Sequence, residues 1–471
     1  MKVLTKQAKN RKEIFSMKFT KRKVLVLTLA VCLIAIASMS TLAWFTAQDE
    51  VTNNFYIANS EDDPDKIFSV DVWEDDTLLD VEGEKKLNGI EFENILPGDE
   101  FFKEVHIENT GSYDQYIRAT ITITDAAVWQ QVFGERMVAL EDFVNYKYEG
   151  YAPIHTEVAY YDYENDAFVY QLYYDKAIAA GQEIIVFDTV TINSALDQYQ
   201  AAELAGSFEI KVVADAVQVE NVGNNVYEAF TTVGLVKAIP VSSAEALADA
   251  MAAEGEARII IDPNALENGV LTINSAVKDK TLDFAGADAQ IIFADAADGT
   301  DVVITGIVDT DNKNATRVVT EAGFDGDVTV VDCSFVCGGT NYAAIKPVAG
   351  NITVDSCTFE GVGKSYAIYY SGAFDGNLTI TDSKFENLGS WAIMINNQIS
   401  GSVTIDKCVF ATKDGVMKAL SGVQGDFTFT NNTLIGVKGH DGKAEQILSV
   451  AVVGTKTVTG NTLDGEPWSQ E

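Results

Sequence analysis

A ten-residue unit recurs six times in the C-terminal half of the chain and restricts the fold more than any other feature of the sequence. Positions three and five are apolar in the first five units, and position four is always threonine. The units begin at Gly326, Gly350, Gly376, Gly401, Gly425 and Gly454, in steps of 24, 26, 25, 24 and 29 residues. A strand repeated at this period predicts stacked coils of a right-handed parallel β-helix. Leucine-rich repeats share the period, but their leucine-rich consensus is absent.

Position eight of the unit holds a small or polar residue, and position ten a large apolar one. The position-eight residues are Cys333, Cys357, Ser383, Cys408, Asn432 and Asn461. We expect them to form a ladder at a bend, where side chains satisfy one another from coil to coil. This pattern resembles the asparagine ladder of pectate-lyase-like β-helices. Lys456 breaks the apolar rule at position three, so the last coil is expected to be a capping coil.

Cys333 and Cys357 fall at the same register of adjacent coils, roughly 4.8 Å apart if they stack as neighbouring strands do. Parallel side chains at that spacing favour stacked thiols, whereas export to an oxidising space favours a disulfide, and both remain open. The chain has three histidines, and no cysteine pair has zinc-site spacing, which disfavours a Cys/His metal cluster.

The N-terminus has the pattern of a signal peptide spanning residues 1–43. Nine Lys/Arg residues lie in 2–23, residues 24–36 are almost all apolar, and Thr41 and Ala43 supply the small residues of a cleavage site. Either Met1 or Met17 can be the start. The pattern predicts a secreted protein; an uncleaved anchor is the alternative, although the apolar run is short for a membrane span.

Residues 44–232 predict an antiparallel β-sandwich. Short alternating strands, clearest at 116–123, are separated by Pro/Gly turns. Residues 125–144 look helical and would be an insertion. We expect a linker at 233–241 and the β-helix at 242–471, opened by a capping helix that the Ser242–Glu245 capping box would start. The predicted fold class is therefore all-β, a sandwich followed by a parallel β-helix.

The N-terminal domain resembles the TasA/camelysin family over about residues 20–230. The resemblance rests on residues 41–57, Leu96-Pro97-Gly98-Asp99, Asn109-Thr110-Gly111-Ser112, Tyr116-Ile117-Arg118, Ala180-Gly181-Gln182-Glu183 and Ala214-Asp215-Ala216-Val217-Gln218. It implies a jelly-roll-like sandwich, export from a Gram-positive bacterium, processing by a SipW-type signal peptidase, and a place in the biofilm matrix or on the cell surface. Camelysin's reported metalloprotease activity is not carried over, because no zinc-binding histidine pair is present.

The formal net charge of −37 excludes a nucleic-acid partner on electrostatic grounds, and leaves calcium as a candidate ligand without implying any cofactor. No catalytic residues can be assembled, so we expect a structural or adhesive protein rather than an enzyme. The alternative is a polysaccharide lyase or glycoside hydrolase carried on a matrix-associated domain. The acids of the regular coils sit at turn positions, where Asp commonly bonds to the local backbone.

A polysaccharide is a further candidate partner. Tyr342, Tyr366 and Trp391 align on consecutive coils, and facing outward they could stack on sugar rings. Facing inward they would be core. The cleaved N-terminal segment 44–58 could in turn add a strand to a neighbouring subunit and build filaments, or could fold back into its own sheet.

Overall fold

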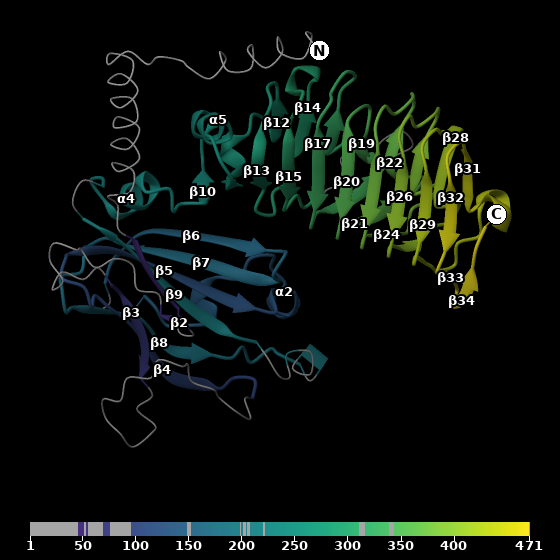
Figure 1. The fold of residues 1–471 in the computed structure, drawn as a ribbon. Helices are drawn as coiled ribbons and strands as arrows, with labels where there is room; N and C mark the ends of the chain where they lie inside the picture. The colour runs from purple at the N-terminus through teal and green to yellow at the C-terminus, as the bar shows by residue number, and fades with distance from the viewer. Residues whose placement is uncertain are drawn as a thin grey trace, which may run out of the picture.

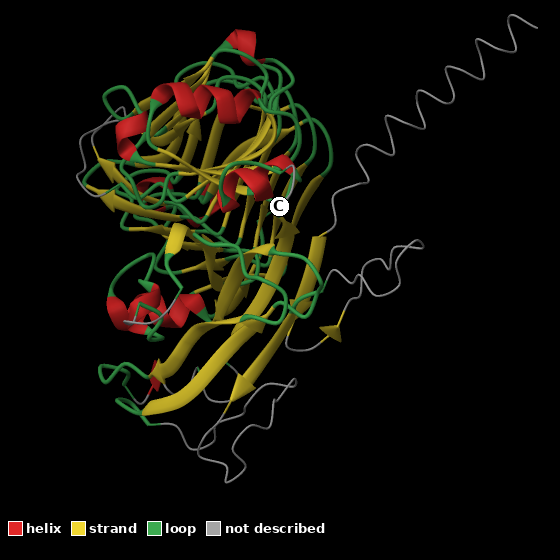
Figure 2. Cartoon of the chain, turned by 90° about the vertical axis from the view of Figure 1, so that its left-hand side faces the viewer, coloured by secondary structure: helices red, strands yellow, loops and turns green. Residues whose placement is uncertain are grey.

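The computed structural model describes residues 46–50, 53–54, 69–75, 96–147, 152–197, 199–200, 204, 208–219, 222–309, 316–338 and 343–470. They form two β-rich domains, an antiparallel one followed by a right-handed parallel solenoid of about eight turns (Figure 1). Helices are few and short beside the strands (Figure 2). The predicted fold class is confirmed. None of the helices in the described residues is long and apolar enough to cross a membrane.

Two antiparallel sheets make up the N-terminal domain. The six-stranded sheet has the order β2 (Asn53–Asn54), β1 (Thr46–Glu50), β9 (Ile210–Gln218), β5 (Gln115–Thr124), β7 (Ala167–Tyr174) and β6 (Ile154–Asp162). The three-stranded sheet has the order β3 (Asp71–Asp75), β4 (Glu100–Glu108) and β8 (Glu183–Thr191). Every residue of β7 is buried. Its two faces contribute to two different apolar clusters, one inside the domain and one beneath helix α4 (Val226–Thr232).

The N-terminal segment pairs within its own domain over the part that the structure describes. Strand β1 pairs antiparallel with β9, from Thr46 opposite Val217 to Glu50 opposite Val213, and also with β2. The expected helical insertion at 125–144 is shorter than predicted. It consists of α2 (Ala126–Phe133) and the single turn η1 (Leu140–Asp142).

Three parallel sheets form the solenoid. The first contains β10 (Ala238–Val241), β11 (Ala257–Ile261), β13 (Lys278–Asp283), β15 (Asp301–Thr305), β17 (Asp327–Val331), β20 (Asn351–Asp355), β23 (Leu378–Thr381), β26 (Val403–Asp406), β29 (Phe427–Thr430) and β32 (Lys456–Thr459). The second contains β12 (Val270–Ile273), β14 (Gln290–Phe293), β16 (Val318–Thr320), β19 (Ala343–Lys346), β22 (Tyr366–Tyr370), β25 (Ile393–Ile395), β28 (Met417–Val423) and β31 (Leu448–Val452). The third contains β18 (Ser334–Gly338), β21 (Thr358–Val362), β24 (Lys384–Glu386), β27 (Val409–Ala411), β30 (Thr433–Leu434), β33 (Asn461–Leu463) and the reversed strand β34 (Glu466–Trp468).

Each repeat unit builds a strand of the first sheet, a bend and a strand of the third sheet. The inward apolar positions of the first five units are buried, and the position-ten phenylalanines stack, with ring centroids 4.7 Å apart between Phe359 and Phe385 and again between Phe385 and Phe410. Position seven adopts the left-handed conformation in every unit. The residues there are Asp332, Ser356, Asp382, Lys407, Asn431 and Gly460, with φ between 47° and 73°. Asp and Asn tolerate this region best among residues with a side chain, which explains the aspartates Asp332 and Asp382 at position seven.

The N-terminal end of the solenoid differs from the prediction in two details. Residues 238–241, expected to be linker, form β10, the first strand of the first sheet. Helix α5 (Ala244–Ala252) does cover the coil end, with Leu247 and Ala250 buried, but its N-cap is Ser243, whose hydroxyl accepts from the Ala246 N–H at 3.2 Å. Single turns η2 (Pro263–Ala265), η3 (Asp295–Ala297), η4 (His440–Gly442) and η5 (Ala444–Gln446) lie between strands.

Candidate functional site

The position-eight residues lie together at the buried bend between the first and third solenoid sheets. All six are at most 3% exposed. The ladder is most regular at its C-terminal end, where Asn432 Oδ1 accepts from the Cys408 N–H at 2.8 Å and Asn461 Oδ1 accepts from the Asn432 N–H at 2.9 Å. Ser383 does the same for the Cys357 N–H, at 3.1 Å. These side chains therefore satisfy buried backbone donors, which is a structural role.

The cysteines of the solenoid are free and buried. Burial raises the pKa of Cys337 and of Cys408 to about 12, and it also raises the pKa of Cys357, beside Cys333. Because the thiolate is the reactive form, these groups are inert at neutral pH.

The three residues predicted to bind a glycan do not form one exposed ladder. Tyr342 lies outside the described residues, as do Thr41 and Ala43 of the cleavage site. Trp391 is 3% exposed, and its ring contacts His440 and the Lys418 ammonium. Tyr366 is half-buried on the preceding coil. Trp391 is therefore core, whereas Tyr366 remains accessible.

Tyr366 belongs to a small aromatic patch on the second sheet. Its ring stacks on that of Tyr369 at 4.9 Å and 23°. The Tyr369 hydroxyl accepts from Asn396 Nδ2 at 3.1 Å, and Lys346 Nζ lies 5.9 Å from the Tyr370 ring centroid. Half-buried rings can pack on the apolar face of a sugar, and the neighbouring amide and ammonium can bond to its hydroxyls. This patch is therefore the candidate binding surface.

Two of the acids that the sequence placed at turns bond to the next coil rather than to the local backbone. Asp355 and Asp406 accept hydroxyl hydrogen bonds from Thr381 at 2.5 Å and from Thr430 at 2.6 Å. The bond from Thr430 lowers the pKa of Asp406. Within the described residues no cluster of three His, Cys, Asp or Glu side chains could hold a metal ion. Calcium binding stays a prediction.

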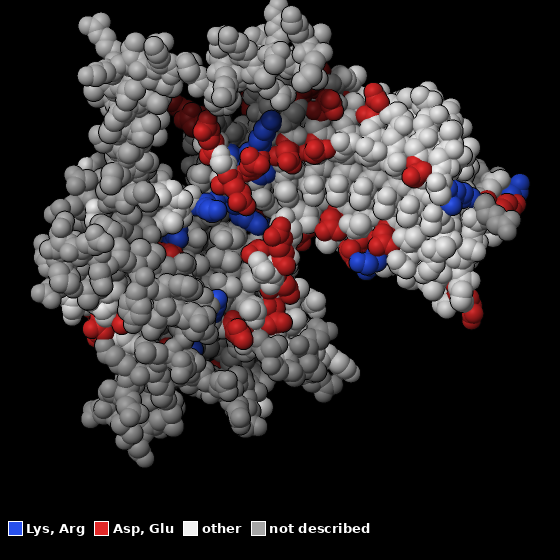
Figure 3. Space-filling view, viewed as in Figure 1, with Lys and Arg blue, Asp and Glu red and all other residues white. Residues whose placement is uncertain are grey.

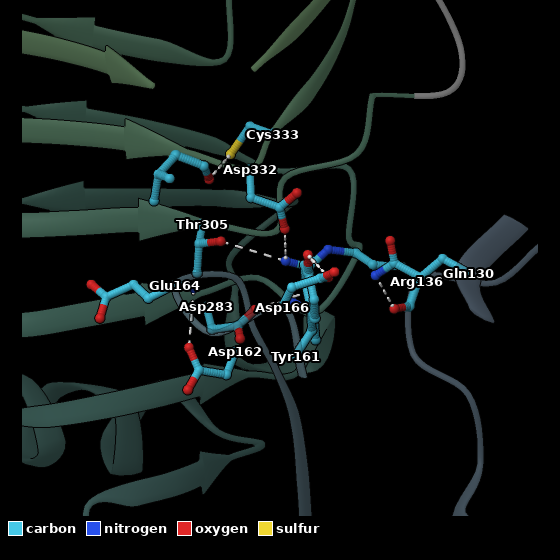
Figure 4. Close-up of polar contacts among 12 residues, drawn as sticks. Gln130, Arg136, Tyr161, Asp162, Glu164, Asp166, Asp283, Thr305, Asp332 and Cys333 are labelled. Atoms are coloured by element: carbon cyan, nitrogen blue, oxygen red, sulfur yellow. Dashed lines mark hydrogen bonds and ion pairs between the residues drawn. The ribbon is translucent and has the colours of Figure 1, made fainter. Parts of the chain in front are cut away.

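A charged junction joins the two domains, and sequence reasoning missed it. Arg136, after α2, donates from Nη2 to Asp332 at 2.7 Å and to the Thr305 hydroxyl at 3.4 Å (Figure 4). Its Nη1 lies 3.7 Å from Asp283, a carboxylate whose side chain is 2% exposed. Burial raises the pKa of Asp332, an effect that Arg136 opposes. The left-handed aspartate of one coil thus also anchors the sandwich.

A second arginine reaches back across the same junction. Arg258, on β11, donates from Nη1 to Asp283 at 2.8 Å and to the Tyr161 carbonyl of β6 at 3.0 Å. Its guanidinium lies 4.8 Å from the centroid of the Tyr160 ring. Asp283 is therefore shared by one arginine from each domain.

An apolar cluster continues the junction beneath α4. It includes Tyr173 and Val217 of the sandwich, Phe230 of α4 and Ala238 of β10, with Ile260 of β11 packed against it. Beside this cluster, Arg118 pairs with Asp215 at 2.6 Å, both nearly buried. The domains consequently share a core as well as ion pairs.

Acidic side chains gather where the two domains meet, whereas much of the visible solenoid surface carries few charges (Figure 3).

On the first sheet the outward position-four residues are all half-buried threonines, in register from Thr329 to Thr457.

No protein-family model, curated protein or solved structure was found to match this chain. The resemblances to TasA/camelysin and to pectate-lyase-like β-helices therefore stay predictions from short motifs. The solenoid fold itself is consistent with a structural or binding module.

Proposed function

We propose that this protein is a secreted structural or adhesive component of the cell surface or biofilm matrix of a Gram-positive bacterium, and that it is not an enzyme. The sandwich would attach it to the matrix, after removal of residues 1–43 by a SipW-type signal peptidase. The solenoid would act as a spacer or binding arm.

The observation that carries this proposal is the fixed attachment of a long solenoid to the sandwich. Ten strands in the first sheet, at roughly 4.8 Å each, correspond to a rod about 43 Å long. Two arginines, two aspartates and a shared apolar cluster fix the sandwich along the first five strands of that sheet, from β10 to β17. A rigid arm of this kind holds its far end at a set distance from its anchor, which suits a spacer.

The Tyr366–Tyr369 patch supports a polysaccharide as the partner of the arm. Binding of a neutral glycan should depend on these rings and not on Trp391. We expect Tyr369→Ala to abolish an interaction that Trp391→Phe leaves intact. Equal loss in both variants would instead indicate damage to the fold.

The deciding experiment is localisation of the tagged protein in the producing organism, with and without its signal peptidase. We expect extracellular protein in the matrix fraction, and retention in the cell when the peptidase is absent. Cytoplasmic protein in both strains would overturn the proposal. Release of unsaturated or reducing ends from acidic glycans by the purified chain, with or without calcium, would establish the lyase or hydrolase alternative.

A further inference from the structure

The two ends of the solenoid are finished differently. At the N-terminal end α5 lies over the coil and buries Leu247. At the C-terminal end the chain reverses after β33, so β34 runs antiparallel to it and the coil path stops (Figure 1). The last strands of the first and second sheets, β32 and β31, each pair with a preceding coil alone among the described residues.

The final segment covers only part of this end. Trp468 packs edge-on against Phe429, with ring centroids 6.1 Å apart. The side-chain amide of Gln470 accepts from the backbone N–H of Leu448 and donates to the backbone carbonyl of the same residue. The final segment therefore runs from the third sheet to the start of β31. Within the described residues, which end at Gln470, the edge of β32 and the rest of β31 stay outside that cover.

Core positions are consequently less buried here than one coil earlier. Val458 is half-buried, whereas Phe429 and Ile405, in the same column, are 0% exposed. Val453, directly after β31, is 73% exposed. In a parallel strand, every second residue directs both its N–H and its C=O to the same neighbouring strand. Here the carbonyls of Thr455 and Thr459 face the preceding coil, because they accept from backbone N–H groups of β29 and of the residue after it. The N–H and C=O of Val458 therefore point toward the open edge.

The charge of this edge suits a second copy of the same chain. The whole chain carries −37, so most surfaces of two copies repel each other. Residues 447–463 contain no Asp or Glu and a single Lys. Two such edges can approach without the repulsion that the rest of the surface would impose.

We propose that the C-terminal edge of the solenoid, formed by 449–453 and 456–459, is a tail-to-tail contact between two copies of this chain. A two-fold axis would pair β32 antiparallel with β32 of the second copy. The contact is closed, because each copy uses the same edge, so the product is a dimer and not a filament. The inference is independent of where the protein resides.

The test compares two exposed valines in the chain without the predicted signal peptide, residues 44–471. Val453→Asp places a charge at the proposed contact, and by symmetry two charges per dimer. Val362→Asp makes the same change on β21, at a site 46% exposed and several coils away. Circular dichroism melts establish that both variants fold.

Light scattering over a wide range of protein concentration should show a rising mass that ends at twice the monomer for the parent chain. We expect Val453→Asp to shift the midpoint at least tenfold to higher concentration, and Val362→Asp to leave it unchanged. The Val458 amide should become protected from hydrogen exchange as concentration rises. A monomer at every concentration, masses beyond the dimer, or equal effects of the two variants would overturn the proposal.

Discussion

Replacing Asn432 by leucine tests whether the position-eight ladder stabilises the solenoid. Asn432 Oδ1 accepts from the Cys408 N–H at 2.8 Å, and its Nδ2 donates to Asn461 and to the Ile405 carbonyl at 3.0 and 3.1 Å. Leucine fills a similar volume and makes none of these bonds. The buried Cys408 N–H would lose its acceptor, which costs about 1–3 kcal/mol. At 2–4 °C per kcal/mol for a domain of this size, the solenoid transition should fall by roughly 2–12 °C.

Asn432→Ser is the matched control, because Ser383 shows that a hydroxyl at this register accepts the equivalent N–H. We expect the serine variant to retain most of the stability that the leucine variant loses. The assay is thermal unfolding of the full chain together with hydrogen exchange at the Cys408 amide, which reports local opening. Equal transitions in the parent, leucine and serine chains would refute the reasoning.

Three further outcomes follow from buried charges and thiols. Arg118→Leu should cost about 3–5 kcal/mol in urea unfolding, because it leaves Asp215 buried and uncompensated, and adding Asp215→Leu should recover part of the loss. Burial raises the pKa of Asp332 in the folded chain above its ordinary 3.8. The contribution of this carboxyl to stability is therefore complete below pH 3.8 and is lost as the pH rises through the raised pKa. Asp332→Asn should remove this pH dependence from unfolding curves measured stepwise in pH. Cys337 and Cys408 should not react with a thiol reagent until the chain unfolds, and rapid native labelling would contradict their burial.

The coils were predictable because their signal is local. Alternation along one strand decides which side chains face inward, and repetition in register decides what stacks on what. Asp332 and Asp382 at position seven also fit a local signal, since left-handed backbone favours Asp and Asn. Residues 238–241 were expected to be linker; they contain Pro240, and β10 is an edge strand, where a proline is tolerated.

The junction had no such signal. Arg136 and Asp332 are separated by 196 residues, and neither belongs to a motif that marks it as an interface residue. The alignment of Tyr366 and Trp391 on consecutive coils also could not predict that one is half-buried and the other is buried. A side chain at Gly415, on the next coil, would collide with the Trp391 ring, so the glycine provides the space in which the ring lies. That glycine is a signal that could have separated the buried Trp391 from the accessible Tyr366.

The coil-by-coil construction makes length a variable that evolution can change on its own. Every unit presents the same strand and the same left-handed bend, and each of the first five buries an apolar pair at its inward positions. Duplication or loss of one complete unit would therefore change the reach of the arm by roughly 4.8 Å and leave both ends intact. The sandwich with its junction, and the terminal strands, could remain constant while related proteins differ in how far they extend.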